Sequence, residues 1–433
     1  MSDKVGSENA VAVPVGWRAK LRQVGPGMMA AATGVGAGDL VATMVAGSRF
    51  GYTLLWAVVV GTIFKIALAE AVGRWHLASG KTIISGWRTL GMWVLVYFGA
   101  YAVVWGFVYG ATAMSASALP LNALFPDISV RYWGMICGVV GLTLVMFSRY
   151  GIIEKFMTFL VGIMFVTVVG TAILVTPNLL DTLNGFVPRL PDGSFVYVLG
   201  LVGGVGGTIT MAAYGYWTMA KGWRSVRWLS MMRLDNTVGY VTTGIFVIAM
   251  LIVGSELLIG QEIISGDEGL LVLGDTLAAD YGQWARIPFL VGFFAVSFSS
   301  LVGVWNGVSL LFADWWRTLR LPGVAKDDTG LSDLEDHDRN AGERSWVYRG
   351  YMLWLTFPPM LLLFLDRPFQ VTVAYGVLGA LFMPFLAGTL LVLLNTSRVP
   401  REGRSGWLSN SLLTICLVMF AYLAVDEIIG TFS

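Results

Sequence analysis

Charged residues and cysteines are scarce in this sequence of 433 residues. Only 13% of the residues are charged and 56% are apolar, whereas about a quarter of a soluble domain is charged. This balance excludes a globular protein that faces water on all sides. The two cysteines, Cys137 and Cys416, both lie inside apolar stretches, so neither a disulfide framework nor a thiolate metal site is expected. A net charge of +1 also argues against nucleic-acid binding, which needs a concentrated basic face.

Long apolar windows recur along the whole chain. A helix that crosses a bilayer needs roughly 20 mostly apolar residues. Hydropathy predicts an all-α integral membrane protein with about eleven transmembrane helices, near residues 24–48, 52–74, 90–117, 131–147, 153–176, 196–220, 236–258, 287–314, 348–366, 369–395 and 407–429. No polar stretch between them is long enough for a soluble domain. We therefore expect neither an enzyme nor a receptor with a soluble output module, and no cofactor other than a transported ion.

The basic residues predict how the chain lies in the membrane, because cytosolic loops are rich in Lys and Arg. With a cytosolic tail at residues 1–23, 22 of the 28 basic residues fall on the cytosolic side. Five fall on the opposite side, and Lys65 is left inside the second span. We predict a multi-pass protein of the cytoplasmic membrane, with the N-terminus in the cytosol and the C-terminus outside. The lipid bilayer is the expected partner, and no obligate protein partner is evident.

A glycine run followed by an acid interrupts the first span. Gly34, Gly36 and Gly38 alternate with other residues, and Asp39 follows them. A glycine destabilises a helix by about 1 kcal/mol relative to alanine, and a carboxylate at the bilayer centre costs about 2.5 kcal/mol or more. Both are tolerated where a helix unwinds to line a cavity and its freed backbone groups coordinate a ligand. Close packing of helices would explain the glycines alone, but it leaves Asp39 unexplained.

The sixth span, five spans later, contains a similar run between Gly200 and Tyr216. Interrupted segments at corresponding places in two halves are typical of transporters with inverted repeats, whose substrate lies between the two breaks. We therefore predict a 5+5 inverted repeat with broken helices 1 and 6. The first repeat covers residues 24–176 and the second covers 196–395, while the helix at 407–429 is additional.

Few other polar residues lie in the spans. Lys65 and Glu70 in span 2 form an ion pair with each other or with neighbouring helices, or Lys65 faces Asp39 as a built-in cation or a group that couples transport. Serines of span 8 supply oxygen ligands, or they bond backbone carbonyls as hydroxyls in membrane helices commonly do. Both pairs of alternatives stay open at this point. The residues of span 8 concerned are Ser297, Ser299, Ser300 and Asn306.

Several motifs resemble those of the natural resistance-associated macrophage protein (NRAMP) family of divalent metal transporters. The matching runs are Gly25-Pro26-Gly27, Phe50-Gly51-Tyr52-Thr53-Leu54-Leu55-Trp56, Ala78-Ser79-Gly80-Lys81-Thr82, Arg149-Tyr150-Gly151-Ile152-Ile153-Glu154-Lys155-Phe156 and Arg233-Leu234-Asp235-Asn236. They touch much of spans 1–7. The resemblance implies a LeuT-type inverted-repeat fold with eleven or twelve helices, and uptake of manganese or iron that is often driven by protons.

The sequence departs from the family at the residues that bind metal. The Asp-Pro-Gly-Asn motif of helix 1 is replaced by Gly36-Ala37-Gly38-Asp39, so one acid is lost and the asparagine position is an acid. The helix 6 motif Ala-x-x-Met-Pro-His is replaced by Thr208-Ile209-Thr210-Met211-Ala212-Ala213, which keeps the methionine and loses the histidine. The acids on the proton path of helix 3 have no counterpart in residues 103–110. The sequence therefore resembles a divergent branch of the family and not a standard member.

The leading hypothesis is a secondary transporter that moves Mn²⁺, Fe²⁺ or Mg²⁺ by alternating access. Asp39 and Met211 are the expected metal ligands, with Thr208, Gly36 and backbone carbonyls of the two breaks beside them. A thioether favours manganese and iron over harder ions, whereas Mg²⁺ keeps several waters and needs few carboxylates. Met211 is otherwise a packing residue.

Two alternatives remain at this stage. One is the same fold carrying an organic cation, for which the rings of Tyr214, Tyr216 and Trp217 are suitable. The other is a sensor or scaffold that does not transport.

Overall fold

The described part of the computed structural model contains helices and no strands. It comprises residues 13–175, 177–204, 207–258, 267–320, 345–364 and 368–432, so residues 1–12 of the predicted tail lie outside it. The helices of the first half are α1 (Trp17–Leu21), α2 (Pro26–Gly34), α3 (Ala37–Phe50), η1 (Gly51–Leu54), α4 (Leu55–Ser79), α5 (Ile83–Leu90), α6 (Met92–Leu124), α7 (Val130–Phe147), α8 (Tyr150–Leu174) and α9 (Leu179–Asn184). The later helices are α10 (Phe195–Gly204), η2 (Ile209–Ala213), α11 (Tyr214–Ala220), η3 (Val226–Trp228), α12 (Leu229–Leu257), α13 (Asp267–Tyr281), α14 (Gln283–Arg320), α16 (Trp346–Met360), η5 (Leu361–Phe364), α17 (Pro368–Asn395), η6 (Arg401–Gly403) and α18 (Trp407–Phe432).

Helices coincide with every predicted span, but only six stretches of the described chain are long and apolar enough to cross a membrane. They are Thr43–Ser79, Met92–Leu124, Val130–Phe147, Tyr150–Leu174, Val226–Leu257 and Gln283–Arg320. The spans predicted at 24–48 and 196–220 are divided into short helices, and a half-helix falls below the length that a bilayer requires. The all-α membrane fold is confirmed, and the number eleven stays a prediction.

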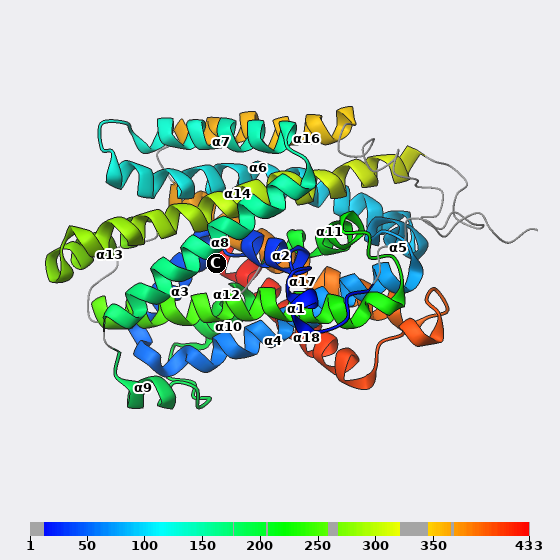
Figure 1. The fold of residues 1–433 in the computed structure, drawn as a ribbon, viewed down its shortest axis with the longest axis horizontal. Coiled ribbons are helices and arrows are strands. Elements are labelled where there is room, and N and C mark those ends of the chain that lie inside the picture. Colours follow the sequence, from blue (N-terminus) through cyan, green and yellow to red (C-terminus); the bar gives the residue numbers. More distant parts are fainter. Residues whose placement is uncertain are drawn as a thin grey trace, which may run out of the picture.

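Two central helices, α12 and α14, organise the packing (Figure 1). Helix α12 lies against α2, α3 and α4, and α14 lies against α2, α6 and α8. Helix α6 also packs against α7 and α16, which lie along the top of Figure 1. Helices α17 and α18 pack on each other and both touch α4. The short helices α2 and α11 contact each other and α14, so these helices enclose the two interrupted segments.

One matching motif forms the turn between α4 and α5. Gly80 ends α4 in the left-handed region, with φ +67°, where its amide N–H donates to the carbonyl of His76. A left-handed glycine is a common helix terminator because it has no Cβ to clash. The Thr82 hydroxyl then accepts the amide N–H of Ser85 at 3.2 Å and caps the start of α5. The motif therefore sets a sharp boundary between two helices.

Candidate ion-binding site at two helix breaks

The first predicted break lies between α2 and α3. Helix α2 ends at Gly34, Val35 and Gly36 are not helical, and α3 begins at Ala37. Gly34, Val35 and Gly36 are all buried. Because the last carbonyls of a helix have no partner inside that helix, the break presents polar backbone atoms in the protein interior. The glycine run thus interrupts the helix, as the sequence predicted.

The second predicted break follows α10. This helix ends at Gly204, and after Gly207 and Thr208 the chain forms the 3₁₀ helix η2 before α11 begins. Gly207 has φ +81°, a conformation that residues with a Cβ rarely adopt. A Cβ at Gly207 would also lie 2.7 Å from the hydroxyl oxygen of Thr210 and 3.0 Å from the Cα of Gly34. Position 207 therefore requires glycine on two counts.

The two breaks touch each other through their backbones. The amide N–H of Gly207 donates to the carbonyl of Gly34 at 3.0 Å. The preceding carbonyl, that of Thr33, accepts the hydroxyl of Ser300 at 2.9 Å, and this hydroxyl also shares a hydrogen bond with Tyr109 at 2.8 Å. Ser300 therefore binds a backbone carbonyl, which was one of its two predicted roles. The C-terminal end of α2 is held by α14 on one side and by the second break on the other.

The predicted ligands lie on or beside these breaks. Gly36 is in the first break, and Thr208 lies between Gly207 and η2. Met211 is fully buried in η2. Asp39 lies in the first turns of α3, and its side chain falls outside the described part of the structure. The sequence prediction of a site from Asp39, Met211, Thr208 and Gly36 thus remains a prediction.

Two hydroxyl groups close to the second break lack partners. The side-chain oxygens of Thr208 and Thr210 are buried and accept or donate no hydrogen bond within the described residues. A methyl carbon of Thr208 faces Gly379 of α17, where a Cβ would lie 3.0 Å away. Buried hydroxyls are normally hydrogen-bonded, so these two oxygens are available to bind a polar group or an ion at the break. Among the same residues, no group of three His, Cys, Asp or Glu side chains is placed to hold a metal.

Lys65 reaches the second break from the middle of α4. Its side chain is fully buried, and its Nζ donates to the carbonyl of Gly207 at 2.6 Å. The same Nζ lies 5.8 Å from the centre of the Phe420 ring in α18. The backbone carbonyl of Gly207, a group of the kind predicted to coordinate the transported ion, therefore already accepts an ammonium proton.

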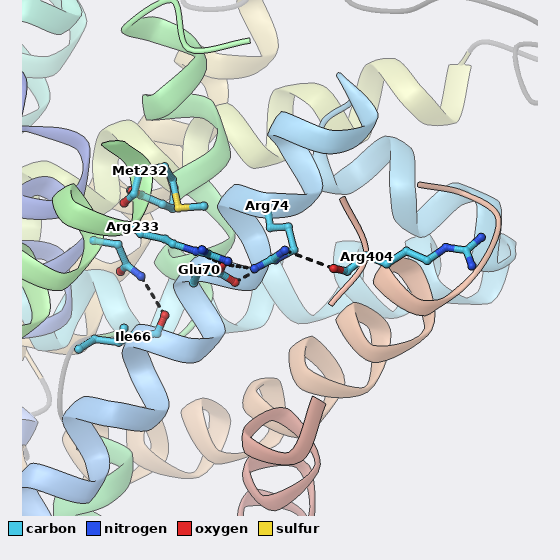
Figure 2. A network of polar contacts seen from close by, with 8 residues as sticks. Ile66, Glu70, Arg74, Met232, Arg233 and Arg404 are labelled. Atoms are coloured by element: carbon cyan, nitrogen blue, oxygen red, sulfur yellow. Dashed lines mark hydrogen bonds and ion pairs between the residues drawn. The ribbon is translucent and has the colours of Figure 1, made fainter. Parts of the chain in front are cut away.

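Glu70 belongs to a different polar cluster, which Figure 2 shows at close range. Its carboxylate pairs with Arg74, one turn further along α4, and with Arg233 of α12 at 2.9 Å. Arg74 also donates to the carbonyl of Arg404 at 3.3 Å, which ties α4 to the segment before α18. The five-residue spacing from Lys65 places the two side chains in separate environments, so Glu70 joins helices and does not line the breaks.

Sequence reasoning missed the residue that holds the start of α2. Asp235 of α12 is fully buried, and its carboxylate oxygens accept the amide N–H groups of Gly25 at 2.8 Å and Gly27 at 2.6 Å. The hydroxyl of Tyr214 in α11 donates to the same carboxylate at 2.8 Å. A negative charge at a helix N-terminus is stabilised by the unpaired amides and by the helix dipole. Asp235 therefore fastens α2 to α12 and α11 together.

Three motifs that resembled the NRAMP family converge at this point. Gly25 and Gly27 come from the first motif and Asp235 from the last. Glu154 comes from the motif that opens α8, and its Oε1 would lie 1.6 Å from a Cβ at Gly25. Glu154 also pairs with Lys221 at 2.6 Å. The two glycines thus leave room for the carboxylates of Asp235 and Glu154. The three motifs that resemble the family therefore meet in one contact, at the start of α2.

The aromatic side chains after the second break use their polar atoms to join helices. The hydroxyl of Tyr216 donates to Asp314 of α14 at 2.5 Å. The indole N–H of Trp217 donates to the Asn306 side chain at 2.9 Å, and Asn306 in turn donates to the Tyr348 hydroxyl at 3.1 Å. Together with Tyr214, these residues bind α11 to α12 and α14, and Asn306 joins α14 to α16. Their polar ends therefore have structural partners.

The arrangement of two broken helices inside a helical bundle defines a membrane protein with the LeuT-type fold. Solved structures agree: a manganese transporter of Eremococcus coleocola superposes with a TM-score of 0.79 at 15% identity, covering 98% of this chain and 90% of that chain. Mhp1, a nucleobase-cation-symport-1 family transporter, gives a TM-score of 0.58 at 11% identity, with 94% and 91% coverage. At these identities the likeness shows the fold alone.

Sequence comparison identifies the family. The model for natural resistance-associated macrophage protein-like proteins matches residues 27–430, and this chain belongs to that family. A relative named divalent metal cation transporter MntH, from Mycobacterium leprae, is 27% identical over 312 residues, which are 66% of this chain and 70% of the relative. The predicted family is confirmed. A second relative, metal transporter Nramp6.1 of Populus trichocarpa, is 30% identical over 201 residues, which are 43% of this chain and 35% of the relative.

Proposed function

We propose that this protein is a secondary transporter that moves a divalent metal ion, Mn²⁺, Fe²⁺ or Mg²⁺, across the cytoplasmic membrane by alternating access. Its family membership and the printed names of its relatives support a metal cargo. The observation that carries the site is the hydrogen bond between Gly207 and Gly34, which brings the two helix breaks into contact. Broken helices that meet in the membrane interior bind substrates and ions with their freed backbone groups.

The proposed ion site combines Asp39 with Met211, with Thr208 and Gly36 beside them. Support comes from the burial of Met211, from the buried Thr208 hydroxyl without a partner in the described structure, and from the position of Gly36 in the first break. A site with one carboxylate and one thioether leaves room for water on the ion, as Mg²⁺ prefers. The thioether adds preference for Mn²⁺ and Fe²⁺.

The proposed topology has the N-terminus in the cytosol and the C-terminus outside, because of the distribution of Lys and Arg. Residues 24–176 and 196–395 form the two inverted repeats, and 407–429 is an additional helix. In this orientation the start of α2, held by Asp235, faces the cytosol. The alternative cargo, an organic cation, gains no support from Tyr214, Tyr216 and Trp217, whose rings are buried and whose polar atoms bind neighbouring helices.

Flux into proteoliposomes tests the proposed function. We expect saturable uptake of Mn²⁺ or Mg²⁺ by the wild type and its loss in Asp39→Ala, because that substitution removes the only carboxylate predicted at the site. Asp275→Ala, which removes an exposed carboxylate of α13, serves as the matched control and should transport normally. The panel contains Mn²⁺, Fe²⁺, Mg²⁺, Ca²⁺ and an ammonium-type organic cation. Uptake of the organic cation alone, or of no solute at all, contradicts the proposal.

A further inference from the structure

Lys65 is a fully buried cation in an apolar stretch of α4. A buried charge is unfavourable unless specific polar groups receive it. One receiving group is the carbonyl of Gly207, 2.6 Å from the Lys65 Nζ. The second helix break therefore supplies a polar group that holds this lysine.

Gly207 connects the lysine to both breaks. Its amide N–H donates to Gly34 of the first break, and its carbonyl accepts from Lys65. Freed carbonyls of broken helices are the groups that coordinate cations in transporters of this architecture. At the second break, one of these carbonyls is occupied by a cation that belongs to the protein.

We propose that the Lys65 ammonium is a tethered cation that competes with the transported metal ion at the second break. This inference rests on the proposed function and adds that Lys65 lowers the affinity of the site. Two positive charges repel strongly where water is excluded, so the ammonium must leave the Gly207 carbonyl when the metal binds. Such competition keeps the metal from binding too tightly to be released.

Other groups near the second break can receive the ammonium once the metal ion displaces it from the Gly207 carbonyl. The buried hydroxyl oxygens of Thr208 and Thr210 lie one and three residues after Gly207, and they have no hydrogen-bond partner within the described chain. Hydroxyl oxygens accept from an ammonium and also coordinate a metal ion. The Phe420 ring of α18 lies 5.8 Å from Nζ, within the range of a cation–π contact. The flexible stem of a lysine permits movement between such groups.

Mn²⁺ binding to the full-length protein in detergent, measured by titration calorimetry, tests this inference. Lys65→Gln removes the charge and keeps a donor for the Gly207 carbonyl, and Lys65→Arg keeps the charge. We expect Lys65→Gln to bind Mn²⁺ at least about tenfold more tightly than the wild type, because a repelling charge is absent. Lys65→Arg should not tighten binding. Melting temperatures show whether each variant folds, and Lys65→Met carries the same expectation if Lys65→Gln does not fold.

The outcomes separate this inference from the proposed function. If the wild type binds the metal ion and folded Lys65→Gln binds it equally or more weakly, the inference of a tethered cation is wrong and the proposed function still stands. Equal tightening in Lys65→Arg also overturns it, because a purely steric effect would explain that result. Failure of the folded wild type and of Lys65→Gln to bind Mn²⁺, Fe²⁺ or Mg²⁺ overturns the proposed function and this inference with it.

Discussion

Gly27→Ala should prevent the protein from reaching a stable fold. A Cβ at Gly27 would lie 2.2 Å from the backbone carbonyl oxygen of Asp235 and 2.9 Å from its carboxylate. The closest atom belongs to the backbone of α12, so relief requires α2 and α12 to separate. Overpacking of this kind costs about 1–3 kcal/mol and more where backbone must move. We expect a strong fall in melting temperature, or no monodisperse protein, in fluorescence-detected size-exclusion chromatography.

The reciprocal substitution and an open glycine serve as controls. A Cβ at Gly239 would lie 2.2 Å from the carbonyl oxygen of Gly27, so Gly239→Ala should be as harmful as Gly27→Ala. Gly162 of α8 is exposed and would place its Cβ in open space, so Gly162→Ala should melt at or above the wild-type temperature. If Gly27→Ala melts at the wild-type temperature, the close contact between α2 and α12 does not limit the size of the residue at this position.

Asp235→Ala should destabilise the protein by about 2–6 kcal/mol, because it leaves two buried backbone amides without an acceptor. The substitution leaves the amides of Gly25 and Gly27 and the Tyr214 hydroxyl without their shared acceptor. Each unsatisfied buried donor costs about 1–3 kcal/mol. The loss should appear as a lower melting temperature and as reduced metal flux, because the start of α2 is no longer fastened.

A second aspartate separates the effect of this network from the loss of any carboxylate. Asp275 is largely exposed and pairs with Arg286 at 3.1 Å. Exposed ion pairs contribute about 0.2–1 kcal/mol, so Asp275→Ala should change the melting temperature little. Asp235→Asn keeps the shape but offers only one acceptor oxygen to three donors, and it should fall between the wild type and Asp235→Ala. Equal melting temperatures of Asp235→Ala and Asp275→Ala would contradict a stabilising role for the hydrogen bonds of Asp235.

The helix breaks could be predicted from the sequence because their signals are local. Glycines at alternate positions before Asp39, and a second glycine run between Gly200 and Tyr216, stand out within apolar windows. The structure confirms that both helices are broken. The same breaks reduce the number of long apolar helices in the structure, since each of these two predicted spans is divided into segments shorter than a bilayer requires.

The contacts at the site could not be predicted, because they join residues distant in sequence. Lys65 and Gly207 are 142 positions apart, and Gly27 and Asp235 are 208 apart. The sequence placed Lys65 beside Asp39 or Glu70 as alternatives. Periodicity along one helix indicates which side chains share a face, but it does not indicate which carbonyl of another broken helix the lysine reaches.

Diffraction from crystals grown with Mn²⁺ tests the central claim most directly, because the anomalous signal of manganese locates the ion. The transported metal should give one peak between the two helix breaks, beside Asp39 and Met211, and this peak should disappear in Asp39→Ala. In the crystal with metal, Lys65 should no longer contact the carbonyl of Gly207. A manganese peak elsewhere in the bundle, with the breaks still joined to Lys65, would contradict a metal site at the two breaks.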